Sequence, residues 1–175
     1  MEFDLGLAGN LALPYQGLVN SRPPDDHVGR RKPAAGVHIH LGEPTIVFVT
    51  VCSEKRVPWI AQSEVHELLL ETWGEAEAWL VGYYLLMPDH MHLFCAPRNL
   101  NIFFNRWMSY WKRLFTQKAQ HPDWQWQSHH WDTRLRRAEN YTEKWYYIRE
   151  NPVKEGLVKS ADDWPYQGMV NMLPW

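Results

Sequence analysis

The chain of 175 residues has only two cysteines, no long apolar run and a net charge of only −2. Cys52 and Cys95 form no CxxC pair and cannot build a disulfide framework, which predicts buried thiols in a reducing compartment. The N-terminal residues are acidic and lack the apolar stretch that a signal peptide or a membrane span requires. With 45% hydrophobic residues, the composition predicts one packed cytoplasmic domain with no membrane partner.

Aromatic residues and local charge stand out against this background. Eleven Trp and an aromatic content of 14% favour either a tightly packed core or a surface that meets flat ligands such as bases. Residues 1–97 carry 6 Lys and Arg against 12 Asp and Glu, whereas residues 98–159 carry 12 against 6. The basic block suits a phosphate-rich partner, although charge alone favours a solvated basic helix.

Residue patterns predict an α+β fold. Apolar runs indicate strands at 45–52, 78–88, 90–96 and 124–136, of which the second and third form a hairpin. Periodic stripes and capping residues indicate helices that begin at Ser63, at Asn99 or Asn101, and at Asn140, the last ending at Asn151-Pro152. This order predicts a ferredoxin-like sandwich, an antiparallel sheet with helices on one face. We divide the chain into an irregular N-terminal arm (1–44), the domain (45–160) and a C-terminal tail (161–175).

His90 and His92 are the sharpest chemical feature. Residues two apart in a strand point the same way, so both imidazoles share one face of the sheet. Two neutral imidazoles at this spacing suit a divalent metal, whereas the alternative is a pair of satisfied surface histidines. His38 and His40 repeat the spacing, but they lie in the arm without a partner helix, and the adjacent His129 and His130 would face opposite sides of a strand.

The third predicted helix carries a second polar group. Tyr147 and Asn151 are four residues apart, so they share a helical face with Lys144, while the core stripe comprises Tyr141, Trp145 and Ile148. Tyr147 could also be one more amphipathic aromatic beside Tyr146. Taken with the histidines, however, a metal held by two imidazoles and an amide keeps positions for phosphate oxygens. A tyrosine, with an ordinary pKa near ~10, needs such a polarised electrophile or an apolar pocket to react at neutral pH.

Three segments resemble a known family. LMPDHMHLF (86–94), YYIRENPVKEGLV (146–158) and DWPY (163–166) look like the REP-associated tyrosine transposases, a branch of the single-tyrosine, His-hydrophobic-His transposases. The resemblance runs from about Thr45 to Tyr166. It implies that Tyr147 rather than Tyr146 is the nucleophile, and that Mg²⁺ or Mn²⁺ binds to His90, His92 and Asn151.

The resemblance also bears on the DNA groove. Arg136 matches an arginine that ends the strand before the catalytic helix, whereas Thr133 stands where related proteins often carry histidine. From the basic block and this match we expect DNA contacts from seven residues: Arg106, Lys112, Arg113, Arg136, Arg137, Lys144 and Lys154.

The favoured function is metal-dependent cleavage and strand transfer of single-stranded DNA at hairpin-forming repetitive elements, through a 5′-phosphotyrosine. The alternative is a non-catalytic protein, derived from a transposase, that binds hairpin or single-stranded DNA. An RNA-binding sandwich is a weaker third reading, because the strands carry no RNP-type aromatic motif. Both a monomer and a homodimer stay open.

One feature falls outside the resemblance. Residues 14–20 (PYQGLVN) and 165–171 (PYQGMVN) differ only at Leu18 and Met169. We hypothesise that the two copies occupy equivalent environments. The alternative is a duplicated tail without a structural counterpart.

Overall fold

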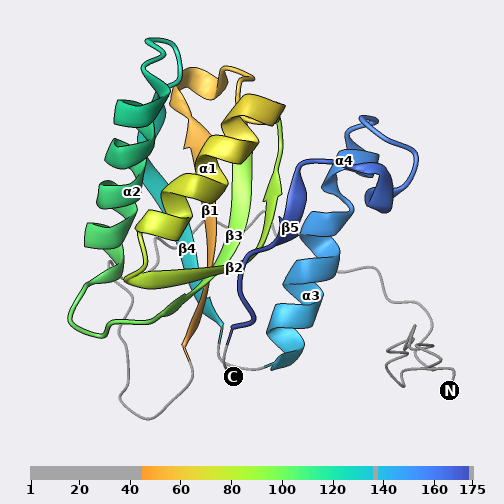
Figure 1. The fold of residues 1–175 in the computed structure, drawn as a ribbon. Coiled ribbons are helices and arrows are strands. Elements are labelled where there is room, and N and C mark those ends of the chain that lie inside the picture. Colours follow the sequence, from red (N-terminus) through yellow and green to blue (C-terminus); the bar gives the residue numbers. More distant parts are fainter. Residues whose placement is uncertain (1–44, 136–137, 174–175) are drawn as a thin grey trace, which may run out of the picture. The chain divides into compact units, whose positions relative to one another are not determined.

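Five strands form one antiparallel sheet in the order β4-β1-β3-β2-β5 (Figure 1). The computed structural model describes residues 45–135 and 138–173. The strands are β1 (Ile46–Ser53), β2 (Trp79–Leu86), β3 (His90–Pro97), β4 (Trp126–Leu135) and β5 (Gln167–Met169). The predicted hairpin of β2 and β3 is confirmed. The predicted arm lies outside the described residues, so the proposed domain boundaries stay predictions.

Helices cover both faces of this sheet. They are α1 (Ser63–Glu75), α2 (Phe104–Ala119), α3 (Ala138–Arg149) and the single-turn α4 (Asn151–Lys154), with short 3₁₀ turns at Glu54–Arg56 and Ala161–Asp163. The α+β class and the predicted element order are confirmed. The expectation of helices on one face holds for α1 and α2, but α3 packs on the opposite face (Figure 1). None of the described helices is both long and apolar enough to cross a membrane.

The reason for two covered faces lies in the buried strand β1. Val47, Val49 and Val51 pack in the cluster under α1 and α2, whereas Ile46 and Phe48 pack in a second cluster with Ile148 of α3. Because alternate residues of a strand point to opposite sides, an apolar run without polar interruptions needs cover on both sides. The single-face prediction overlooked this consequence of the sequence TIVFVTVC.

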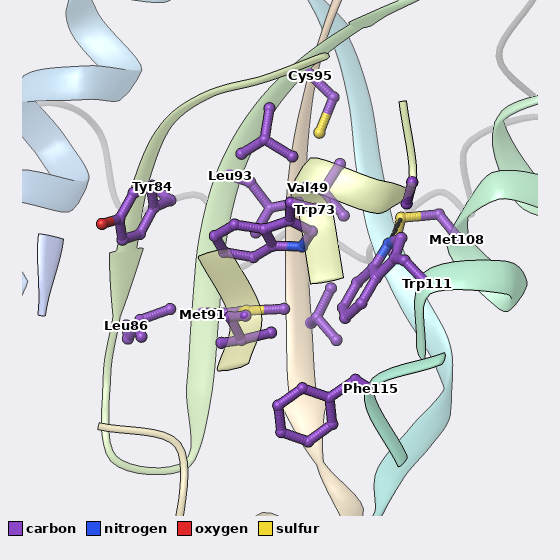
Figure 2. Close-up of a cluster of buried hydrophobic side chains, with 14 of the residues drawn as sticks. Val49, Trp73, Tyr84, Leu86, Met91, Leu93, Cys95, Met108, Trp111 and Phe115 are labelled. Atoms are coloured by element: carbon purple, nitrogen blue, oxygen red, sulfur yellow. Dashed lines mark hydrogen bonds between the residues drawn. The ribbon is translucent and has the colours of Figure 1, made fainter. Parts of the chain in front are cut away.

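Tryptophan fills the first of these clusters. Figure 2 shows Trp73 and Trp111 among Met91, Leu93 and Met108 between the sheet and the two helices. Elsewhere in the cluster, the indole nitrogens of Trp79 and Trp107 donate to backbone carbonyls at 2.9 and 2.7 Å, so burial leaves them satisfied. Both cysteines are buried thiols, as predicted. The excess of Trp therefore serves mainly the core.

Helix α1 begins at Ser63 as predicted, but its cap and the starts of α2 and α3 differ from the sequence expectation. Gln62, not Ser63, is the N-cap of α1, and no side chain caps it. Helix α2 begins at Phe104, and Asn99 caps no helix but forms a local turn in which its Oδ1 accepts from the Asn101 amide at 3.0 Å. Helix α3 begins at Ala138, so Asn140 lies inside the helix rather than capping it.

The predicted tail contributes strand β5, which sequence analysis missed. It pairs antiparallel with β2, and Tyr83 Oη donates to Gln167 Oε1 at 2.6 Å. At Gly168 a Cβ would lie 2.7 Å from Tyr84 Oη, so a larger residue there would displace the Tyr84 phenol. Met169, where the two repeat copies differ, is 58% exposed. The first copy lies outside the described residues, so the equivalence of the two copies stays a prediction.

Candidate active site

His90 and His92 lie on β3 on the face that α3 covers. Their ring centroids are 4.9 Å apart in an edge-to-face arrangement, and both side chains are buried. Met91 between them points into the opposite cluster. The predicted shared face is therefore confirmed, and surface placement of the two imidazoles is wrong.

Three neighbours hold the ring of His92. Thr50 Oγ1 lies 2.9 Å from Nδ1, and Phe48 stacks on the ring at 5.5 Å. The Asn151 amide nitrogen lies 3.2 Å from Nε2 and donates to it when the proton is on Nδ1. The hydrogen bond from Asn151 thus ends on the lone pair that an imidazole offers to a metal.

Burial keeps His92 neutral. Loss of solvent lowers its pKa to about 3, and the positive charges of a protonated His90, Lys144 and Arg56 act in the same direction. A neutral imidazole is the form that coordinates metal ions. The environment therefore supplies a ligand without requiring deprotonation at neutral pH.

An acidic side chain that the sequence analysis missed orients His90. Asp89 Oδ1 lies 2.7 Å from His90 Nδ1, and Arg56 Nε lies 2.6 Å from Asp89 Oδ2. Arg56 has a left-handed backbone (φ 60°), and its Nη1 also reaches Cys52 Sγ at 2.7 Å. A carboxylate on Nδ1 fixes the tautomer that leaves Nε2 free for a metal. The signal was available, because Asp89 directly precedes the first histidine.

His90, His92 and Asn151 could bind a divalent cation such as Mg²⁺ or Mn²⁺. None of the three is an acidic side chain, however, so they would not balance the charge of the ion. Within residues 45–135 and 138–173, no three His, Cys, Asp or Glu side chains gather in a ligand cluster. The third protein ligand would be the Asn151 amide, which would turn Oδ1 toward the imidazoles. The donor set of two imidazoles and one amide oxygen is neutral, so anionic phosphate oxygens would complete it favourably.

Tyr147 lies on α3, four residues before Asn151, and is 58% exposed. Lys154 Nζ lies 4.6 Å and Lys144 Nζ 5.9 Å from its ring centroid, and Lys144 also lies 5.5 Å from the Phe48 ring. Tyr146, also exposed, instead packs edge-on against Trp145 at 4.8 Å. The two adjacent tyrosines therefore differ in surroundings, and only Tyr147 lies against both lysines.

Tyr147 and Asn151 keep the predicted spacing of one helical turn, although the helix is interrupted between them. Helix α3 ends at Arg149 and Asn151 opens α4, but Glu150 between them keeps a right-handed helical backbone (φ −80°, ψ −6°). The predicted core stripe is confirmed, since Ile148 is buried in the second cluster and Tyr141 and Trp145 pack against it. The same packing brings Asn151, just beyond the end of α3, to His92 at 3.2 Å.

The expected DNA contacts fall into two groups. Lys144 and Lys154 lie at the candidate site, whereas Arg106, Lys112 and Arg113 belong to α2 on the other face of the sheet. Lys112 Nζ donates to the Gln127 carbonyl at 2.9 Å, and burial lowers its pKa to about 8. Arg136 and Arg137 lie outside the described residues.

The alternative histidines stay apart from the site. His130 contacts the ring of Phe104 on α2 at 5.5 Å, so it points away from the face of His90. His129 is exposed on the other side of β4. The predicted opposite orientation of this pair is confirmed, whereas His38 and His40 fall outside the described residues.

Comparison with known proteins finds similarity both in sequence and in structure. No family model matches the chain. A REP-associated tyrosine transposase of Escherichia coli (strain K12) is 34% identical over 93 residues, or 53% of this chain and 52% of the relative, so the chain matches about half the length of that protein. The fold is similar to that of a REP-associated tyrosine transposase bound to a REP hairpin, with a TM-score of 0.62, 21% identity, and coverage of 77% of this chain and 82% of that one. The resemblance to the REP-associated tyrosine transposases is confirmed by these similarities in sequence and in fold.

Proposed function

We propose that the chain is a transposase of single-stranded DNA that cleaves and rejoins strands at hairpin-forming repetitive elements. One observation carries the proposal: the amide of Asn151 meets the lone pair of His92 at 3.2 Å, four residues along the chain from an exposed tyrosine flanked by two lysines. A core-building role explains neither the buried imidazole pair nor the lysines over Tyr147. The relatives named above support a hairpin DNA partner.

In the proposed reaction Tyr147 is the nucleophile. Its phenolic oxygen loses a proton to solvent and bonds to a phosphorus of the DNA backbone, while the bond from that phosphorus to the 3′ oxygen breaks. The 3′ oxygen takes up a proton and leaves as a hydroxyl, and the phosphate stays on the tyrosine as a 5′-phosphotyrosine. Attack by a 3′-hydroxyl on the same phosphorus releases Tyr147 and rejoins a strand.

The other residues of the site bind and orient the phosphate. His90, His92 and Asn151 would hold Mg²⁺ or Mn²⁺, which when bound stabilises the charge that develops on phosphate oxygens. Lys144 and Lys154 bind non-bridging oxygens near Tyr147. Asp89 and Thr50 contact the Nδ1 atoms of His90 and His92 and so orient the two imidazoles, whose Nε2 atoms would bind the metal.

Covalent trapping on labelled DNA tests this proposal. A hairpin oligonucleotide with a single-stranded extension, incubated with Mn²⁺, should give an adduct that survives denaturing electrophoresis. Tyr147→Phe removes one hydroxyl and should abolish the adduct but leave hairpin binding nearly intact, whereas Tyr146→Phe should retain it. Hairpin binding by the wild-type chain without any adduct would instead identify a non-catalytic DNA-binding protein.

A further inference from the structure

Among the tryptophans within residues 45–135 and 138–173, Trp131 is the most exposed. Trp131 is 49% exposed on β4, while the Trp residues under α1 and α2 are buried. Among the residues that the structure describes, no aromatic ring or cation packs against its indole. An exposed indole offers a flat aromatic surface on which a nucleobase can stack.

The strand register places Trp131 in line with the candidate site. In the ladder Trp131 pairs with Thr50, and Thr50 pairs with His92 on the far side of β1. Leu135, in phase with Trp131 on β4, joins the cluster under α3, whereas His130 points to α2. Trp131 therefore stands on the same face as His92, two strand spacings or ~10 Å away.

We propose that Trp131 is a stacking platform for a base of single-stranded DNA, the base next to the phosphate bound at Tyr147. This assignment rests on the proposed function and adds a binding site for the nucleotide. The phosphate would lie by Lys144 and Lys154, and the adjoining sugar and base would extend across Thr50 toward β4. Every base has an aromatic face, so this contact would hold the strand without selecting its sequence.

Charge on this face supports DNA as the occupant. Lys144 and Lys154 surround Tyr147, and Arg56 lies beyond His90. Asp89 is engaged by both Arg56 and His90, so its charge is compensated. Asp132, the neighbour of Trp131, alternates to the opposite face of the strand. An exposed indole on the face that also carries Lys144 and Lys154 matches the combination of base stacking and phosphate attraction that single-stranded DNA requires.

The test uses 2-aminopurine, a fluorescent base that is quenched when it stacks. Single-stranded oligonucleotides carry it at successive positions around the cleavage site, and binding is measured with full-length protein in the Tyr147→Phe background, which separates stacking from chemistry. We expect quenching at one position next to the scissile phosphate. Trp131→Ala should abolish it and weaken binding by about 5- to 150-fold, whereas Trp131→Phe should retain most of both.

Phe103→Ala is the matched control. Phe103 is an exposed aromatic that precedes α2, on the opposite side of the sheet, so its loss should leave quenching and affinity unchanged. Equal affinity and equal quenching in Trp131→Ala and the parent would overturn the platform, while a normal adduct from wild-type protein would leave the proposed function standing. Quenching that depends on Trp131, without a covalent adduct from wild-type protein, would support the stacking platform and overturn the proposed cleavage.

Discussion

The two faces of the sheet differ in what their alternating residues meet. Under α1 and α2 the buried cluster is almost wholly apolar and rich in aromatic rings. Under α3 the apolar cluster is smaller and gives way along β1 and β3 to Thr50, His90 and His92. The same strands therefore supply a dry core on one side and a polar site on the other.

Strand β3 shows how one strand can contribute to the core on one face of the sheet and to the candidate site on the other. Met91 anchors β3 in the dry core, and its neighbours on either side belong to the site. Rigid packing on one face fixes the position of the imidazoles on the other, because a one-residue slip would exchange the two sets. We expect substitutions to separate along this line, with activity lost on one face and stability on the other.

The largest effect should come from His90→Ala and His92→Ala. Each removes one of two imidazole donors, so metal-dependent cleavage should fall to the background level while the dry core keeps the chain folded. Calorimetric titration with Mn²⁺ measures the loss of binding directly. His129→Ala changes an exposed histidine of β4 and should behave as wild type, whereas wild-type Mn²⁺ affinity in His90→Ala would disprove the site.

The next largest effect should appear on the opposite face. Trp111 is fully buried between α2 and the sheet, so Trp111→Ala should lower the free energy of unfolding by about 3–5 kcal/mol. Urea denaturation measures this loss, with Trp131→Ala as the matched comparison. The exposed Trp131 should cost far less, about 0.5 kcal/mol or less. Similar losses from both would mean that the two faces are not separated as described.

The sequence predicted the strands, the helix order and the shared face of His90 and His92, because these follow from local periodicity. It missed the cover on both faces and strand β5, because both depend on which distant segments meet. The Gln167 contact with Tyr83 joins residues 84 positions apart, which no local pattern reveals. Thr50 escaped notice for the same reason, since its link to His92 follows only from the register of β1 and β3.

A smaller effect should follow from Asp89→Asn, which tests whether a residue that orients a metal ligand also affects metal binding. The amide keeps the shape but removes the charge that orients His90 through Nδ1 and holds Arg56. Loss of such an outer partner lowers metal affinity by about 10- to 100-fold. Mn²⁺ titration should show this decrease, whereas Glu77→Gln, which breaks the exposed pair with Arg98, should not. Equal Mn²⁺ affinity in Asp89→Asn and wild type would mean that Asp89 pairs with Arg56 but does not support metal binding.

The smallest effect concerns which face attracts DNA. The basic block of the sequence divides between Lys144 and Lys154 at the site and the exposed Arg106 and Arg113 on α2. Each phosphate contact to single-stranded DNA contributes about 0.7 to the slope of log affinity against log salt concentration. Lys144→Gln and Lys154→Gln should each flatten that slope by about this amount, measured by fluorescence anisotropy in the Tyr147→Phe background. If DNA follows only the polar face, Arg106→Gln and Arg113→Gln will leave the slope unchanged. A flattened slope in the arginine variants, with none in the lysine variants, would move the groove to α2 and separate DNA binding from the imidazole site.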